Sequence, residues 1–354
     1  MAVASASTDR NTVITREKGI RGNAGADGTD GTGLNLVRES KLSSPIVKVL
    51  AANYPAVIGF DVMNWERNSI ARGINKYGQL ASADVGIPRE TSQGWMIEGD
   101  STNLLLNSDT LSTQSISVSS QPHVLSFYGT GTVTLSGVYT GSLVGTGTND
   151  RVTLAFTPAT GSLTVTVSGT VEYAQIEQSL FATSYITSAG TAGERLADDV
   201  YLGGFNNVPL MSEDFSIWMR LYFDGFTGND DFIISLPNGF NTDDLTVCGF
   251  CNSGSMTFRI SDGTTSADCT STISALTQYD VCFIKAANEI TLHVNGVLQD
   301  TQAHSINVPT GQNGLLKIGG NEAGTTKNMH GKLYDVRIYD FLLNESEVTF
   351  LSEV

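Results

Sequence analysis

The chain has 354 residues, of which 40% are hydrophobic, so it can bury more than one core and two or three domains are expected. It carries 36 acidic and 20 basic residues, a net charge of −16. This balance argues against binding nucleic acid or an anionic membrane surface, because both need clustered Lys and Arg. No apolar run reaches the roughly 18 residues of a membrane span, and the N-terminal sequence lacks the basic and apolar regions of a secretory signal. We therefore expect no membrane insertion, and synthesis in a cytosol.

Residues 1–18 are polar and have no amphipathic period, which predicts an arm that would be disordered on its own. In residues 19–33 glycine recurs at every third position: Gly19, Gly22, Gly25, Gly28 and Gly31. A collagen-type triple helix needs this period, because only glycine fits where three chains meet on the axis. These glycines are therefore candidate trimerisation residues of a parallel homotrimer. The segment has no proline, so a flexible spacer is the alternative.

The rest of the chain has the composition of an all-β protein, with 37 glycines, many Thr and Ser, and few helical periods. Between residues 118 and 207, apolar residues alternate with polar ones in short runs such as Val124–Tyr128 and Leu163–Val167. This period of two predicts a sandwich of half-buried antiparallel strands. A linker is predicted over residues 187–199.

The last third predicts a second sandwich. Phe215–Phe223 is an almost continuous apolar strand, and Asn295-Gly296 is a two-residue hairpin signal after a run of alternating apolar residues. Asn344 and Glu347 are spaced as a capping box, which predicts a short C-terminal helix.

Several motifs follow one another before the first predicted sandwich: Asn64-Trp65-Glu66-Arg67-Asn68-Ser69, Tyr77-Gly78-Gln79-Leu80, Ile87-Pro88-Arg89-Glu90, Gly94-Trp95-Met96-Ile97-Glu98-Gly99 and Ser101-Thr102-Asn103-Leu104-Leu105-Leu106-Asn107-Ser108. The series resembles a cassette of bacteriophage tail and virion proteins, although it lacks the aspartate-tyrosine segment that usually follows the Pro-Arg pair. In that family a β-sandwich follows. The resemblance continues through residues 125–137, 173–177 and 181–186, a block similar to a carbohydrate-binding-module-like jelly roll.

The last third is similar to the concanavalin-like, laminin-G-type sandwich. The resemblance rests on His293-Val294-Asn295-Gly296, Leu316-Lys317-Ile318-Gly319-Gly320 and Gly331-Lys332-Leu333-Tyr334-Asp335-Val336-Arg337-Ile338-Tyr339-Asp340, followed by Glu347-Val348. Together the resemblances imply an all-β protein with two antiparallel sandwiches after a collagen-like or extended arm. The implied domains are a virion-attachment arm (1–18), a Gly-X-Y segment (19–33), a connecting neck cassette (34–107), a carbohydrate-binding-module-like sandwich (108–198) and a laminin-G-like sandwich (199–354).

The four cysteines are Cys248, Cys251, Cys269 and Cys282. The first two form a C-x-x-C motif, which could open a zinc site or a redox pair. The other two lie too far apart to complete the zinc pattern, so we expect reduced, buried cysteines.

Calcium is a second metal to consider. Oxygen ligands crowd at Asn229, Asp230 and Asp231, and at Asp243 and Asp244. Laminin-G-like domains sometimes hold calcium between loops at the sandwich rim, and a solvated turn is the alternative. The sequence names no ligand set, and no cofactor is expected.

The sequence contains no G-x-S-x-G or H-E-x-x-H motif, and we expect no catalysis. Glu172 and Glu177 could be imagined as the paired carboxylates of a glycosidase. Five residues apart on a strand they would face opposite sides, so they are predicted to be surface charges.

Glycan binding needs an exposed aromatic side chain beside planar polar groups. Trp218 is predicted to lie in a core. For Trp65 and Trp95, which belong to the cassette, a structural role and sugar binding are equal alternatives. Three tyrosines remain as candidates: Tyr128, Tyr139 and Tyr201.

The hypothesis that joins these features is a structural protein of a bacteriophage virion, assembled in the host cytoplasm. It would be a homotrimeric tail fibre, with the arm bound to other virion proteins of the tail, baseplate or capsid and the sandwiches bound to host-surface glycan. The alternative is a capsid-bound decoration protein or head fibre. A depolymerising tailspike is disfavoured, because such enzymes usually need a long β-helix and a carboxylate site.

Overall fold

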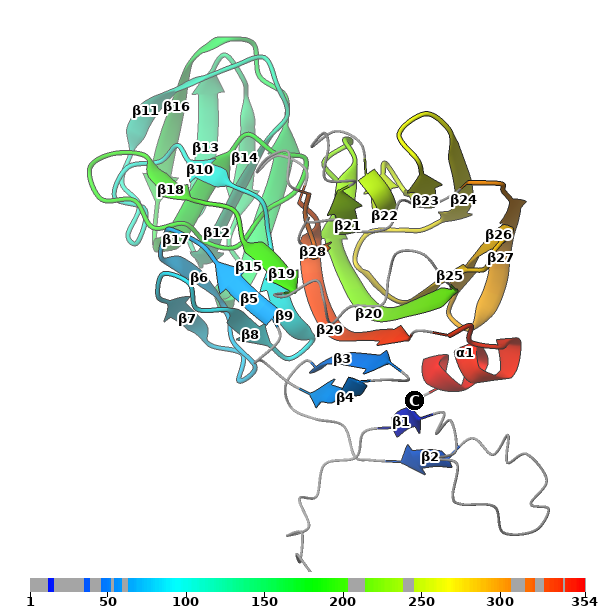
Figure 1. Ribbon diagram of the computed structural model, residues 1–354. Helices are drawn as coiled ribbons and strands as arrows, with labels where there is room; N and C mark the ends of the chain where they lie inside the picture. Colours follow the sequence, from blue (N-terminus) through cyan, green and yellow to red (C-terminus); the bar gives the residue numbers. More distant parts are fainter. Residues whose placement is uncertain are drawn as a thin grey trace, which may run out of the picture.

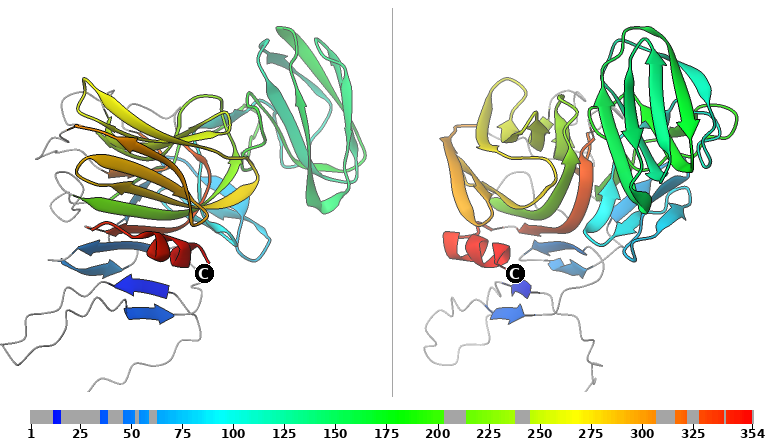
Figure 2. Two further views of the ribbon diagram at one scale, coloured as in Figure 1. Left: turned by 90° about the vertical axis from the view of Figure 1, so that its right-hand side faces the viewer. Right: turned by 180° about the vertical axis from the view of Figure 1, so that it is seen from behind.

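The computed structural model describes residues 12–15, 35–38, 46–51, 54–58, 63–202, 214–237, 245–306, 316–321, 328–339 and 341–353. The five triplet glycines, Gly19 to Gly31, lie outside these residues, as do Asp243 and Asp244. The described part of the chain is almost entirely β-strand, with one α-helix, so the predicted all-β class is confirmed. Figures 1 and 2 show two β-sandwiches side by side.

The first sandwich has two antiparallel sheets. The four-stranded sheet has the order β11 (Gln114–Val118), β16 (Gly161–Ser168), β13 (Thr132–Gly137) and β14 (Gly141–Val144). The three-stranded sheet has the order β15 (Gly147–Phe156), β12 (His123–Gly129) and β17 (Val171–Glu177). Apolar side chains that alternate in the sequence meet between the sheets, for example Leu125, Phe127 and Leu163, all fully buried. The predicted period-two strands are confirmed here.

The second sandwich is larger. Its seven-stranded sheet has the order β24 (Ser266–Thr272), β23 (Ser255–Ser261), β22 (Leu245–Asn252), β21 (Asp231–Pro237), β28 (Leu316–Ile318), β19 (Asp199–Leu202) and β5 (Met63–Glu66). The facing nine-stranded sheet contains β27 (Val297–Ala303), β26 (Glu289–Val294), β25 (Thr277–Lys285), β20 (Phe215–Gly225), β29 (His330–Tyr339), β3 (Ile46–Ala51), β4 (Tyr54–Ile58), β9 (Gly94–Ile97) and β8 (Arg89–Thr91). One large apolar core lies between these sheets.

The segment predicted as a connecting cassette supplies strands to this second sandwich. β3 pairs in parallel with β29, β9 pairs with β29 from the same sheet, and β5 pairs with β19 in the facing sheet. The first sandwich is therefore inserted in the chain between strands of the second. The cassette also forms the hairpin β6 (Ala71–Ile74) to β7 (Leu80–Ala83).

Two further short sheets lie in segments that were predicted to lack structure of their own. β10 (Ser101–Asn103) pairs with β18 (Gly193–Arg195), which lies inside the predicted linker. That segment is therefore part of the folded body. In the predicted arm, β1 (Thr12–Thr15) pairs with β2 (Asn35–Arg38), on the other side of the glycine segment in sequence.

Helix α1 (Glu345–Ser352) covers the outer face of the nine-stranded sheet. The Asn344 side chain accepts a hydrogen bond from the Glu347 backbone N–H at 3.1 Å, and the Glu347 carboxylate accepts one from the Asn344 N–H at 2.7 Å. The predicted capping box is confirmed. Val348 and Leu351 of the helix pack against Trp218 of the sheet.

The predicted hairpin at Asn295-Gly296 joins β26 to β27. Both residues have positive φ, 52° and 79°, as a two-residue turn of the favoured twist requires.

Candidate functional site

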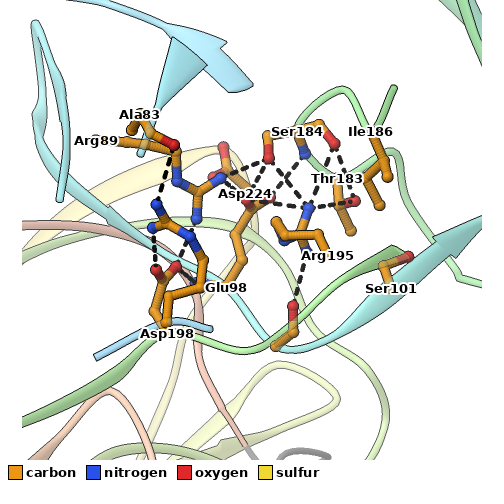
Figure 3. Close-up of polar contacts among 12 residues, drawn as sticks. Ala83, Arg89, Glu98, Ser101, Thr183, Ser184, Ile186, Arg195, Asp198 and Asp224 are labelled. Atoms are coloured by element: carbon orange, nitrogen blue, oxygen red, sulfur yellow. Dashed lines mark hydrogen bonds and ion pairs between the residues drawn. The ribbon is translucent and has the colours of Figure 1, made fainter. Parts of the chain in front are cut away.

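A cluster of buried ion pairs joins the two sandwiches (Figure 3). We call it the ion clasp and define it as Arg67, Arg89, Glu98, Arg195 and Asp198. The first three come from the cassette, and the last two lie in the predicted linker. All five are nearly or fully buried, which is rare for charged residues unless they are paired.

Glu98 is the point where the sandwiches meet in the ion clasp. Its carboxylate pairs with Arg89 and, at 3.3 Å, with Arg195. It also accepts hydrogen bonds from the N–H and O–H of Ser184, at 2.7 and 2.5 Å, in the loop that follows the last strand of the first sandwich. Burial disfavours the charged form, but Arg195 and Arg89 outweigh it and hold the pKa of the Glu98 carboxyl far below its usual range.

Asp198 anchors the other side of the ion clasp. Its carboxylate accepts from Arg67 at 2.8 Å, from Arg89 at 2.5 Å, from the Trp65 indole N–H at 3.1 Å and from the Glu98 backbone N–H at 3.0 Å. Each of the two carboxylate oxygens of Asp198 therefore accepts two hydrogen bonds. Such full satisfaction is what makes a buried charge tolerable.

Glu177 was predicted to be a surface charge, and the structure contradicts this. Its carboxylate is fully buried and accepts hydrogen bonds from Ser101 at 2.6 Å, from the Gln175 amide at 2.6 Å, and from the N–H and O–H of Thr183, both at 2.7 Å. The face of β17 that carries Glu177 is covered by the loop of Thr183, which strand alternation alone does not reveal. Glu172 is half-buried, and β12 pairs it opposite Tyr128.

A cleft of about 250 Å³ lies beside the ion clasp. It is formed by side chains from the first sandwich, from the second sandwich and from the cassette hairpins. Its walls are Gly73, Ile74, Leu80, Thr91, Ser92, Gln93, Met96, Glu98, Tyr128, Arg151, Ala182, Thr183, Ser184, Tyr185, Asp224 and Lys332.

The polar groups of the cleft come from all three parts. Lys332 of β29 pairs with Asp224 of β20, and burial raises the pKa of the Asp224 carboxyl despite this partner. Arg151 of β15 donates to the Thr183 carbonyl at 2.5 Å and to the Ser126 hydroxyl at 2.8 Å. Within the described residues, the Tyr128 hydroxyl and the Gln93 side chain have no hydrogen-bond partner.

Of the aromatic residues considered in the sequence, only Tyr128 lines the cleft. Trp218 is buried under α1, so its predicted place in a core is confirmed. Trp65 and Trp95 are buried edge to face in the second core, which decides for the structural alternative. The other two tyrosines lie elsewhere. The Tyr139 ring packs on Phe156, and Tyr201 donates its hydroxyl to Glu66 at 2.6 Å.

The cysteines are free and buried, as predicted: Cys248, Cys251, Cys269 and Cys282. Among the described residues, no group of three or more His, Cys, Asp or Glu side chains could hold a metal ion. Asp231, the first residue of β21, accepts hydrogen bonds from the backbone N–H and the hydroxyl of Thr227, at 2.8 and 2.5 Å. No helix within the described ranges is long and apolar enough to cross a membrane.

Comparison with known protein families gives one match. The laminin G family described as the concanavalin A-like lectin/glucanases superfamily matches residues 196–349, which cover most of the second sandwich. The second sandwich therefore has a concanavalin-like lectin fold. No curated protein gave a significant match.

The chain is also similar to parts of solved structures that are distant in sequence. The receptor binding domain of botulinum neurotoxin C/D mosaic serotype is 13% identical, with a TM-score of 0.37, over 44% of this chain and 40% of that one. Domain 4 of AbnA, a GH43 extracellular arabinanase from Geobacillus stearothermophilus, solved with arabinotriose, is 17% identical, with a TM-score of 0.36, over 44% of this chain and 73% of the domain. The chain spans about 40% of the length of the toxin domains it matches.

Proposed function

We propose that this chain is a structural, receptor-binding protein of a bacteriophage virion, and that it binds host-surface glycan without catalysis. The observation that carries the proposal is the concanavalin-like lectin sandwich joined by the ion clasp to a second β-sandwich. A rigid pair of sandwiches can present a binding surface at fixed geometry, which lowers the ordering cost of binding.

The carboxyl groups in and beside the cleft support binding rather than hydrolysis, because each is held by protein partners: Asp224, whose pKa is raised, pairs with Lys332, and Glu98 pairs with two arginines. A glycosidase needs one carboxylic acid with a raised pKa to protonate the leaving group. Glu98 has the opposite property, because its pKa is lowered by two guanidinium groups. The carboxylate oxygens of Glu177 accept hydrogen bonds from Ser101, Gln175 and Thr183. We therefore assign the carboxylates of Glu98 and Glu177 a structural role.

The sequence supports a fibre. The glycine triplets of residues 19–33 have the period of a triple helix, and the cassette resembles one of phage virion proteins. An extended triple helix would require β1 and β2 to separate, because their pairing holds the two flanks of the glycine segment together in a single chain. A homotrimer would display three copies of the sandwich pair on one particle, so that weak glycan contacts add through effective concentration. The arm, residues 1–18, would attach the trimer to a tail, baseplate or capsid protein after assembly in the host cytoplasm.

A glycan array probed with the purified full-length chain tests this function. We expect binding to a restricted set of bacterial surface oligosaccharides, and no release of reducing ends from the bound sugars. Absence of binding to every bacterial glycan would contradict receptor binding. Release of reducing ends would identify an enzyme instead.

A further inference from the structure

We propose that the cleft between the two sandwiches is the glycan-binding site, and that it takes a neutral sugar unit of the receptor. This inference rests on the proposed glycan-binding function and adds its place and chemistry. A volume of about 250 Å³ lies below the roughly 300–1,000 Å³ of pockets for drug-sized ligands, so the cleft suits a smaller ligand such as one sugar ring.

The walls of the cleft match the two kinds of surface that a sugar presents. Ile74, Leu80 and Met96 form an apolar side that suits the C–H face of a pyranose ring. On the polar side, Asp224 accepts while Lys332 donates, so this adjacent pair offers complementary partners to neighbouring hydroxyls. Sugars are rich in such vicinal hydroxyl pairs.

Two polar groups of the cleft are uncommitted. The Tyr128 hydroxyl and the Gln93 amide line the cavity and make no hydrogen bond within the described chain. Gln93 is exposed at the turn between β8 and β9, where only its backbone N–H is used, donating to Thr91 at 3.1 Å. Tyr128 is only 8% exposed, and the surface that it exposes lines the cleft. A ligand hydroxyl would give both groups a partner.

The charges that line the cleft favour a neutral ligand. Arg151 and Lys332 are balanced by Asp224 and Glu98, and each of the four already has an oppositely charged or carbonyl partner. Lys332 is neutralised by Asp224, and Arg151 already donates through both terminal nitrogens to the Thr183 carbonyl and the Ser126 hydroxyl, so an anionic ligand would have to compete with these contacts. A neutral hydroxyl can add to these pairs without separating them.

The cleft is held open by contacts that do not involve a ligand. Ser184 on one wall is bonded to Glu98 on another, and Arg151 is bonded to the loop of Thr183. Phe181, at the start of this loop, packs edge to face on His330 of the second sandwich, with ring centroids 5.2 Å apart. The walls are therefore positioned before binding, which reduces the entropy lost on complex formation.

Two mild substitutions test the inference: Gln93→Ala and Tyr128→Phe. Each removes one polar group and no charge. The matched control is Gln302→Ala, an exposed glutamine on β27 at the far edge of the second sandwich. The probes are labelled neutral oligosaccharides of glucose, galactose and N-acetylglucosamine, with sialyllactose as the acidic comparison, and the readout is the Kd of the full-length protein.

We expect each cleft variant to weaken binding of a neutral oligosaccharide about three- to tenfold, the loss of one hydrogen bond, with Gln302→Ala unchanged. Binding by the wild type with equal Kd in all three variants would overturn the cleft and leave the function standing. Binding of sialyllactose alone would overturn the neutral class. If the wild type binds no glycan, both the function and the cleft fail.

Hydrogen exchange of the unsubstituted protein is a second test that does not depend on how a variant folds. A bound neutral oligosaccharide should slow exchange within residues 89–97 and 181–186, the segments that contain the cleft residues Thr91–Gln93, Met96 and Ala182–Tyr185. Protection confined to residues 245–303, on the opposite side of the second sandwich, would place the site elsewhere and contradict the inference.

Discussion

Glu98 shows how one residue can decide whether two domains stay together. Its carboxylate contacts two guanidinium groups and a serine from the neighbouring sandwich, all out of contact with water. Removing one partner of such a group leaves charges that neither water nor protein neutralises. The stability of the junction is therefore concentrated in very few side chains.

Glu98→Gln should lower the free energy of unfolding by about 3–5 kcal/mol, because Arg89 and Arg195 lose the carboxylate that neutralises them. Chemical denaturation followed by tryptophan fluorescence measures this loss. The matched control is Glu194→Gln, an exposed carboxylate on β18, which should change stability by less than about 0.5 kcal/mol. Equal effects of the two substitutions would mean that the ion clasp contributes nothing.

His330 should make stability depend on pH at the same junction. Burial lowers its pKa from an ordinary 6.5 to about 4, so the folded protein binds the proton less well than the unfolded chain. Its contribution to stability is complete above pH 6.5 and is lost as the pH falls towards 4, by up to about 3 kcal/mol.

Unfolding titrations at several pH values, with wild type and His330→Gln side by side, check this. The variant should lose less stability than wild type between pH 6.5 and 4. Parallel pH profiles of the two proteins would show that His330 is not the group responsible.

At the scale of single elements, what the sequence predicted was local. Asn295-Gly296 and the Asn344–Glu347 capping box act over two to four residues, so residue type and spacing were enough. The period-two strands also needed only neighbouring residues. The pairing of strands from distant segments, such as β3 with β29, depends on tertiary packing. No pattern of neighbouring residues in the sequence predicts it.

Helix α1 depends on its cap. Asn344→Ala should destabilise the helix by about 1 kcal/mol, because the Glu347 N–H loses its acceptor and the reciprocal bond loses its geometry. Hydrogen exchange of the α1 amides reports this directly. Ser346→Ala, at an exposed helix position two residues after the cap, should leave exchange nearly unchanged, and faster exchange in both variants alike would contradict the assignment.

The candidate site was predictable only in part. The cassette motifs already contained Arg67, Arg89 and Glu98. Their partners, however, lie far away in the chain: 131 residues separate Arg67 from Asp198, and 86 separate Glu98 from Ser184. The role of Glu177 was missed for another reason, because Thr183, six residues later, folds back over β17 and strand alternation does not reveal this. No composition or period encodes such pairs.

For the whole molecule, the glycine triplets predict a trimer. Light scattering of the full-length protein should give three times the 37.6 kDa of one chain. A chain that begins at Leu34 should be monomeric, because it lacks all five triplet glycines. If both are trimeric, the sandwiches assemble by themselves and the glycine segment is a tether. If both are monomeric, the triple helix is wrong.

The parallel pairing of β3 with β29 also has a consequence for synthesis on the ribosome. About 290 residues separate the first paired positions, Ile46 and Asp335. At a translation rate of roughly 5–20 residues per second, β29 is synthesised about 15–60 s after β3. The first sandwich, whose strands lie between residues 114 and 177, can close during that interval. The nascent chain should therefore acquire its inserted domain first and its surrounding domain last, with β3 exposed to chaperones in the meantime.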